Sequence, residues 1–264
     1  MKSRYFLTVA VAGFVGAGGA WADDGWSFKN VSINHLNWSA KTERNTAPGY
    51  ASKKDFQFVE VEGGMGGKWG EVYGFFDIEN PLNGVAKTDG RDNRRIAYKG
   101  VGRLNLTEVG GLPVQLYGHI YNFSDSTGFN DQNHVVGLGT AFSSGSFWIK
   151  PFLGVHHESK SFAGADFNGL MTGWVLGYSF KLGEQSFMIT NWHETEFNRK
   201  DKFLNTASDA GGTMASSTGH NGAVSLWWNL TPKLTTGLSY RYADGKLGSA
   251  TYQDALILTA KINF

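Results

Sequence analysis

The residues of this chain whose types and spacing could do chemistry stand at every second position of short segments. Within Trp69–Glu79, one set alternates with another: Glu71, Tyr73, Phe75 and Asp77 against Val72, Gly74, Phe76 and Ile78. A period of two places two such sets on opposite faces of a β-strand. The polar and aromatic face could bind a polar, ring-bearing solute through hydrogen bonds and stacking, and the apolar face suits lipid.

Neighbouring segments repeat this alternation and bring opposite charges onto one wall. The predicted solute-binding residues are Glu60, Glu62, Glu71, Tyr73, Phe75, Asp77, Arg95, Lys99, Arg103, Tyr117, His119, Tyr121, Lys150 and Phe152. Carboxylates facing cations across a narrow lumen give a polar solute hydrogen-bond partners on both sides, and aromatic side chains contribute about 1–3 kcal/mol per stacked base. The alternative is that the charges pair across strands to stiffen the wall while the rings fill space.

Two motifs contain histidine next to glutamate, as metal sites often do, but neither has the spacing of a helical metal-binding motif. His156-His157-Glu158 and Trp192-His193-Glu194 do not complete an H-E-x-x-H pattern, because Phe197 stands where the second histidine would be. No serine lies in a recognisable nucleophile motif, and Gly100-Val101-Gly102 is more typical of a bent strand than of a nucleotide-binding loop. The sequence therefore predicts no enzyme, no metal and no cofactor, with a lipid-cleaving barrel as the enzymatic alternative.

About twelve strand-like segments position these residues. We expect them at 26–38, 54–65, 68–79, 93–105, 112–123, 132–142, 146–157, 168–182, 186–197, 220–230, 234–243 and 251–264. Tight turns alternate with long polar loops, the widest at 199–220, and no apolar run reaches the length of a membrane helix. Short turns on one side, long loops on the other and an even strand number indicate an all-β fold, a 12-stranded antiparallel transmembrane β-barrel of the bacterial outer membrane.

The soluble alternatives are a β-sandwich and a lipocalin-like barrel with an apolar interior. Period-two alternation alone cannot distinguish an apolar interior from an apolar exterior. Twelve strands closed around an apolar core would leave a space wider than side chains can fill, since about eight strands already leave little room. Barrel size therefore favours the membrane protein.

The N-terminus is typical of a secretory leader. Lys2 and Arg4 precede an apolar run and an Ala20-Trp21-Ala22 cleavage pattern, so we predict a signal peptide at 1–22 and the barrel at 23–264. Without the two leader cations the formal charge changes from +1 to −1, which gives no basic excess for nucleic acid. The chain has no cysteine, so it does not rely on disulfides.

The last segment, Tyr252–Phe264, carries a nearly apolar row at alternate positions and ends on an aromatic residue. We expect it to pair with the first strand, to close the barrel and to present Phe264 to the barrel-assembly machinery. An interfacial aromatic girdle is predicted from Trp69, Trp148, Trp174, Trp192, Trp227 and Trp228, together with Tyr240, Tyr242 and Phe264.

Two stretches, F-V-E-V-E-G-G at 58–64 and K-W-G-E-V-Y-G-F-F-D-I-E-N at 68–80, make the chain resemble the Tsx-like outer-membrane channels, a family that includes the OmpK barrels. Segments 166–174 and 240–246 carry the resemblance more loosely. It implies a monomeric twelve-stranded barrel with a narrow, nucleoside-selective lumen and, in some members, a phage receptor. Of the predicted site, only Glu60, Glu62, Glu71, Tyr73, Phe75 and Asp77 lie inside the matching hairpin.

The sequence therefore predicts a porin-like outer-membrane channel for passive uptake of nucleosides or similar small polar solutes. Its expected partners are membrane lipid, the solute, the assembly machinery and, at the outer loops, possible phage. One alternative is a surface or phage-receptor barrel of the OmpK type with little solute selectivity. Another is an acidic-sugar porin, which would need continuous tracks of arginine and lysine along the lumen.

Overall fold

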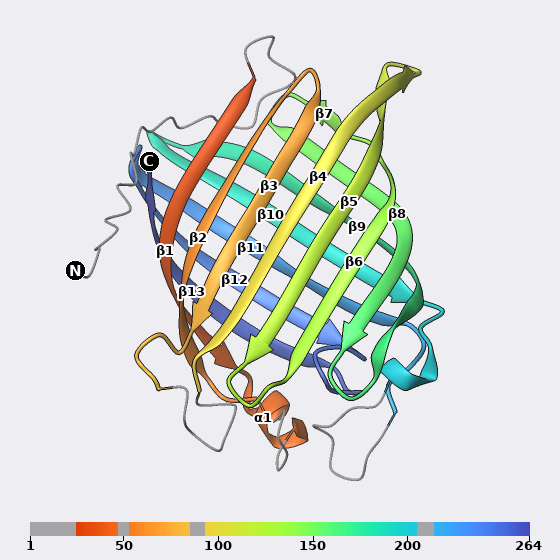
Figure 1. The fold of residues 1–264 in the computed structure, drawn as a ribbon. Coiled ribbons are helices and arrows are strands. Elements are labelled where there is room, and N and C mark those ends of the chain that lie inside the picture. The colour runs from red at the N-terminus through yellow and green to blue at the C-terminus, as the bar shows by residue number, and fades with distance from the viewer. Residues whose placement is uncertain (1–24, 47–52, 85–92, 205–213) are drawn as a thin grey trace, which may run out of the picture.

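The computed structural model describes residues 25–46, 53–84, 93–204 and 214–264, and these form one sheet curled into a barrel (Figure 1). The elements are β1 (Trp26–Trp38), α1 (Ala40–Thr46), β2 (Phe56–Gly67), β3 (Gly70–Glu79), β4 (Arg95–Val109), β5 (Leu112–Asp125), β6 (Asn130–Gly139), β7 (Phe142–Ser144), β8 (Phe147–Lys160), β9 (Gly164–Leu182), β10 (Gln185–Phe197), η1 (Asp201–Phe203), β11 (Gly219–Thr231), β12 (Leu234–Asp244) and β13 (Gln253–Asn263).

Every strand pairs antiparallel with its neighbours, and the sheet closes on itself. β6 and β7 both pair with β8, so they are two segments of one wall strand interrupted at Thr140 and Ala141. The described residues therefore form a closed barrel of twelve strands, and the predicted fold class is confirmed. A closed barrel satisfies the backbone hydrogen bonds of every strand, which is what allows strands to cross lipid.

The closing seam lies between β1 and β13, as the C-terminal alternation predicts. Their register runs from Asn30 opposite Asn263 to Trp38 opposite Ala255. Beyond the last strand residue, the Phe264 amide donates to the Lys29 carbonyl oxygen at 3.0 Å. The apolar row of β13 faces outward, with Leu258 60% exposed.

The two ends of the barrel differ in their connections. Short turns join β2 to β3 and β4 to β5 at one end, and long connections lie at the other end with α1 (Figure 1). α1 occupies a segment for which the sequence indicated only a loop. Ser39 caps it by accepting from the Thr42 amide at 3.1 Å, and Ser39 also donates to Asp254 at 2.6 Å. In a membrane barrel of this kind, the long-loop end faces out of the cell.

Alternate side chains separate into a lipid face and a lumen face. On β2 and β3, Val61, Val72 and Phe76 are 53%, 43% and 42% exposed, whereas their sequence neighbours point to the interior. Among the described residues, no helix is both long and apolar enough to cross a membrane. The predicted leader at 1–22 lies outside the described residues.

The predicted tryptophan girdle is half wrong. Trp69 and Trp228 are exposed on the outer face, 48% and 39%, as predicted. Trp148, Trp192 and Trp227 instead have the lumen parity, and each ring contacts a lumen cation: Lys150 at 5.3 Å, Arg241 at 5.1 Å and Lys261 at 4.5 Å, respectively. Position near a strand end suggested a girdle, but strand parity decides which face a ring occupies.

Candidate functional site in the barrel lumen

The structure places every predicted solute-binding residue on the lumen face. On β4, Arg95, Lys99 and Arg103 share the parity opposite to the exposed Leu104. The same holds on β2, β3, β5 and β8, where the exposed Val61, Val72, Leu116 and Leu153 alternate with the predicted residues. The parity inference is thus correct for orientation, and the contacts inside the lumen decide what each residue can do.

Near the short-turn end, one ion-pair cluster bridges the lumen. Glu71 on β3 forms a salt bridge with Lys150 on β8 and lies 3.4 Å from the Arg103 guanidinium on β4. Lys150 also lies 4.8 Å from the centre of the Trp26 ring on β1. Since β1 and β8 are on opposite sides of the ring of strands, the lumen is narrow enough here for one side chain to span it.

Arg103 joins the two walls by hydrogen bonds as well as by charge. Its guanidinium donates to the carbonyl oxygens of Lys150 at 2.8 Å, Pro151 at 3.1 Å and Thr140 at 3.2 Å, and to the Gln115 side chain at 3.2 Å. Its side chain is only 3% exposed. This many directed contacts identifies Arg103 as a fixed part of the wall rather than a free ligand for solute.

A second bridge lies further toward the long-loop end. Lys99 on β4 is paired with Glu194 on β10, and these strands stand on opposite sides of the barrel. Lys99 is four residues from Arg103, roughly 13 Å along the strand. The two bridges therefore divide the lumen into successive constrictions held by opposite charges. Sequence analysis did not include Glu194 among the site residues, although its parity on β10 could have indicated the lumen.

An acidic wall lies on β2 and β3, from the level of Lys99 toward the long-loop end. Glu62 accepts hydrogen bonds from Asn30 at 3.0 Å and Tyr73 at 2.8 Å, and it pairs with Lys261 at 2.9 Å. Glu60 and Asp77 are register partners on the two strands. The wall thus offers carboxylate acceptors to a solute that carries hydroxyl donors.

Aromatic rings line this wall in an open row. Trp26, Phe28, Tyr73 and Phe75 follow one another with ring centres 6.0, 6.2 and 6.5 Å apart, and all four are half-buried. Trp26 and Phe28 were not among the predicted residues. Their alternation on the first strand was a usable signal, because they share a parity with Asn30. These rings have faces and edges available to a planar solute.

A second aromatic group, on β5 and β8, is closed. Tyr117 and Phe152 are stacked with ring centres 4.1 Å apart, and the Arg103 guanidinium lies 4.7 Å from the Tyr117 ring centre. The Tyr117 hydroxyl and His119 Nδ1 form a hydrogen bond of 2.7 Å, and the histidine tautomer decides which of the two donates. Tyr117 and Phe152 are 2% and 6% exposed, so they form a packed interior cluster with Val135 and Met171. Their predicted stacking role would require this cluster to open.

The remaining predicted residues lie nearer the long-loop mouth. Arg95 pairs with Glu79 at 2.6 Å and lies over the Phe56 ring at 4.6 Å. Tyr121 faces the lumen in register with Lys99. Close to them Leu36, Trp38 and Ala255 form a small apolar cluster that narrows the same end.

One cluster at this mouth has the residue types of a metal site. Ligand atoms of His156, Glu158 and Glu196 all lie within 4.8 Å of one another. The carboxylates already have cationic partners, since Lys246 pairs with Glu196 and Lys160 lies 3.3 Å from Glu158. These ammonium groups neutralise the charge that would attract a cation, so the cluster is better described as a network of ion pairs.

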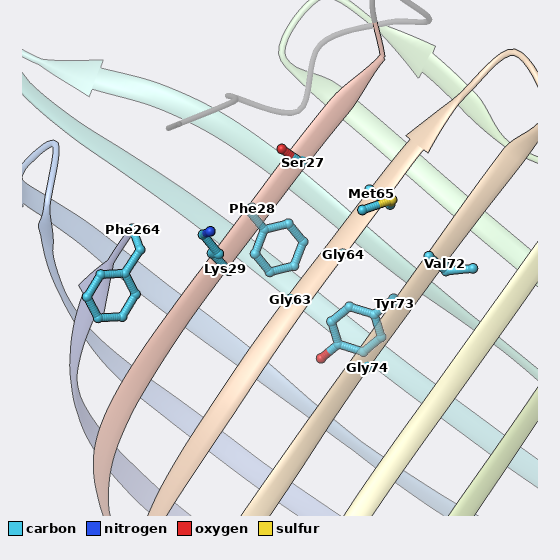
Figure 2. Close-up of a pocket in the computed structure, with 10 residues that line it drawn as sticks. All are labelled: Ser27, Phe28, Lys29, Gly63, Gly64, Met65, Val72, Tyr73, Gly74 and Phe264. Atoms are coloured by element: carbon cyan, nitrogen blue, oxygen red, sulfur yellow. The ribbon is translucent and has the colours of Figure 1, made fainter. Parts of the chain in front are cut away.

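A groove on the outer side of the wall lies beside the aromatic row and shares Phe28 and Tyr73 with it. It has a volume of about 510 Å³ and is lined by ten residues of β1, β2, β3 and the C-terminus (Figure 2). Lys29, Met65 and Val72 in its lining have outward parity, and Gly63 and Gly74 keep the wall thin between them. Most of its lining residues therefore face lipid, whereas Phe28 and Tyr73 belong to the lumen side of the wall.

A closed twelve-stranded barrel with an apolar outer face and a charged, aromatic lumen defines an outer-membrane channel for small solutes. The sequence of residues 33–264 matches the family described as "Nucleoside-specific channel-forming protein, Tsx". The chain belongs to this family, which confirms the resemblance inferred from the 58–80 hairpin and the location in the bacterial outer membrane.

Two solved structures of outer-membrane proteins are among those to which the chain is distantly similar. The chain is similar to the outer membrane channel DcaP of Acinetobacter baumannii at 11% identity, over 96% of this chain and 100% of that chain, with a TM-score of 0.37. It is similar to the translocator domain of the autotransporter NalP from Neisseria meningitidis at 13% identity, over 90% and 88%, with a TM-score of 0.40. Nothing about function follows from likenesses this distant.

Proposed function

We propose that the barrel conducts nucleosides by diffusion, with the solute's base on the open aromatic row and its sugar hydroxyls on the acidic wall. The observation that carries the proposal is the juxtaposition on β2 and β3 of the Tyr73 and Phe75 rings with Glu60, Glu62 and Asp77. Base stacking on aromatic side chains contributes about 1–3 kcal/mol per base, which is weak enough for rapid release.

A solute can pass through the lumen only if the two ion-pair bridges open. Lys99 with Glu194, and Lys150 with Glu71, join walls between which the solute must move. A polar solute can replace an ion-pair hydrogen bond with one of its own, whereas a bare ion meets a partner of its own sign in each bridge. This arrangement favours a neutral polar solute. It disfavours the acidic-sugar porin, because Lys99, Lys150 and Lys261 are each paired with a carboxylate rather than arranged in a continuous basic track.

Osmotic swelling of liposomes that contain the purified barrel tests the nucleoside proposal. Nucleosides should enter faster than sugars of similar size. The double variant Tyr73→Leu with Phe75→Leu removes two rings of the row and should bring the nucleoside rate down to the sugar rate. Equal rates for nucleosides and sugars through the unaltered barrel would contradict the proposal.

A receptor role at the outer loops is a second candidate, and exposed apolar loop residues favour it. Phe162, between β8 and β9, is 99% exposed, and Leu82, after β3, is 92% exposed. Phage adsorption to cells that carry Phe162→Ser with Leu82→Ser distinguishes the roles. A receptor loses adsorption and keeps its conductance, and unchanged adsorption would argue against these contacts.

We also propose that a leader at 1–22 is removed on export, that the barrel is monomeric and that the assembly machinery recognises the strand ending at Phe264. The seam supports the last point, because the Phe264 amide is part of the β1–β13 pairing. Deleting Phe264 should reduce insertion into the membrane far more than it changes the conductance of inserted molecules. Mass spectrometry of the exported chain tests whether the leader is removed. The molecular mass of the purified barrel in detergent, corrected for the bound detergent, tests whether it is a monomer.

A further inference from the structure

The lipid-facing side of β9 to β13 changes from apolar to polar in regular steps toward the long-loop end. Three successive rows of register partners show the change: Ile189, Leu226, Leu238 and Leu258; then Asn191, Val224, Tyr240 and Leu256; then His193, Gly222, Tyr242 and Asp254. Successive outward rows are two residues apart, roughly 7 Å. The apolar part of an amphiphile lying along this face would contact the apolar rows, and its polar part would contact the polar row.

The apolar rows enclose a groove. It has a volume of about 260 Å³ and is lined by Ile189, Val224, Ser225, Leu226, Leu238, Tyr240 and Leu256. The side chains of Leu226, Leu238 and Leu256 are 44%, 46% and 48% exposed, so they are available to an acyl chain. Tyr240 lies at the border of the groove nearer the long-loop end, and its hydroxyl is 2.8 Å from the Tyr252 hydroxyl.

A connected cluster of rings stands directly beyond the groove. His193 is stacked on Trp174 with ring centres 4.6 Å apart, and its Nδ1 atom is 2.8 Å from the Tyr242 hydroxyl. Its Nε2 atom is 3.0 Å from the Thr195 hydroxyl, which is in turn 3.0 Å from His220 Nδ1. The Tyr242 side chain crosses Gly222 to contact His193. A side chain at position 222 would block this contact, because its Cβ atom would lie 2.5 Å from the Tyr242 hydroxyl.

The charges on this face suit hydroxyl groups better than phosphate. Asp244 is exposed in register with His220, and Asp254 follows Tyr242 in the polar row. The Asp254 carboxylate is hydrogen-bonded by Ser39 and Thr42. Carboxylates repel a phosphate but accept from sugar hydroxyls, to which imidazole and phenol groups can also donate or accept.

The opposite end of the same strands lacks this chemistry. There Tyr178, Phe180, Phe187 and Trp228 stack with ring centres 6.1, 5.5 and 5.9 Å apart on the outer face. Phenylalanine and tryptophan belts are general features of both membrane interfaces. The histidines and their hydroxyl network occur at the long-loop end of β10 and β11, which is the level of the outer leaflet.

We propose that this face binds one glycolipid of the outer leaflet, with an acyl chain in the groove and sugar hydroxyls on the His193–His220–Tyr242 cluster. The site is separate from the solute path, because the side chains of the cluster and of the groove lining, other than Ser225, point away from the lumen. Binding would orient the barrel in an asymmetric membrane and stiffen the β10–β12 wall.

Native mass spectrometry of the detergent-solubilised full barrel tests this proposal, with a short-chain lipopolysaccharide stripped of its phosphate groups, phosphatidylethanolamine and phosphatidylglycerol added separately. The glycolipid should bind the unaltered barrel at least tenfold more tightly than either phospholipid. His193→Ala with His220→Ala should remove that preference, and the shape-preserving Tyr242→Phe should reduce it several-fold. Unchanged preference in both variants would overturn the proposal, as would equal binding of the three lipids by the unaltered barrel.

Two matched controls locate the site. His35→Ala changes an outward histidine at the same end of β1, and Phe187→Leu changes the apolar ring stack at the other end of β10. Both should keep the glycolipid preference. A loss with His35→Ala equal to the loss with the double variant would mean a general interfacial effect and would contradict a built site. Unaltered conductance of each variant verifies that the barrel is folded.

Discussion

His193 and Glu194 are neighbours in β10, and they take part in two different kinds of structure. Glu194 reaches across the lumen to Lys99 on the far side of the barrel. His193 contacts the adjacent wall on the outer face, with Trp174 and Tyr242 as its partners. The lumen contact of Glu194 therefore connects distant strands, whereas the contacts of His193 on the lipid face connect β10 with β9, its neighbour, and with β12, one strand further along the wall. The first kind controls passage, and the second controls how the barrel sits in lipid.

The strongest test of this difference is a charge placed at adjacent positions of β3. Phe76→Arg puts a cation into the hydrocarbon region, where arginine costs about 2–4 kcal/mol near the bilayer midplane, so the yield of folded barrel should collapse. Phe75→Arg puts the same charge into the lumen and should leave folding largely intact. Urea unfolding in lipid vesicles measures both. Similar losses for the two variants would contradict the assigned faces.

Removal of one open ring should have the next largest effect. Phe75→Leu keeps an apolar side chain but loses a stacking face, so nucleoside affinity should fall about tenfold, within the 1–3 kcal/mol range of a stacked base. Titration of current block with a nucleoside measures this affinity. Phe152→Leu serves as the matched control, because the Phe152 ring is covered by Tyr117 and should matter less to the solute. Equal losses would show that the closed cluster opens during passage.

The cross-lumen bridge between Lys99 and Glu194 should have a moderate effect. Lys99→Ala removes the connection between opposite walls and leaves a carboxylate in the path, so single-channel conductance should rise about twofold with greater selectivity for cations. The double variant with Glu194→Ala should keep the wider path and lose the added cation selectivity. Reversal potentials in a salt gradient check both expectations. Unchanged conductance in the single variant would mean that the bridge does not limit passage.

The smallest effect is expected at an exposed ion pair outside the barrel lumen. Asp166 lies 2.8 Å from Lys200 and 3.2 Å from Lys202, with all three side chains well exposed. Water and salt screen such pairs, so Asp166→Asn should leave both the unfolding midpoint and the conductance unchanged. A clear change in conductance would show that this loop contact controls the mouth.

The sequence alone was sufficient for the wall of the barrel. Strand bounds such as 26–38 agree with β1, because alternation is a local property that the pleat of a strand imposes. The β1–β13 seam was also predictable, since a barrel leaves its first and last strands to pair. Helix α1 was not predicted: its Ser39 cap is local, but the hydroxyls of Ser39 and Thr42 also donate to Asp254, more than 200 residues away in the sequence.

The sequence was sufficient to predict which side chains face the lumen, but not which of them form ion pairs or stack with one another. Parity placed Lys99 in the lumen, yet no local pattern indicates that its partner is Glu194 across the barrel. Strand parity assigns Trp192 and Trp227 to the lumen rather than to the girdle, although both lie near strand ends. Likewise, nothing in the sequence shows that the Phe152 ring is covered by Tyr117 whereas Phe75 is half-buried, because Tyr117 and Phe152 come from two strands, β5 and β8, that β6 separates.

Single-channel recording in a planar bilayer tests nucleoside conduction most directly. The unaltered barrel should give small currents that a nucleoside blocks in a concentration-dependent manner, and a simple sugar at the same concentration should leave the currents unchanged. Currents that are insensitive to both solutes, or blocked equally by both, would contradict a nucleoside-selective lumen.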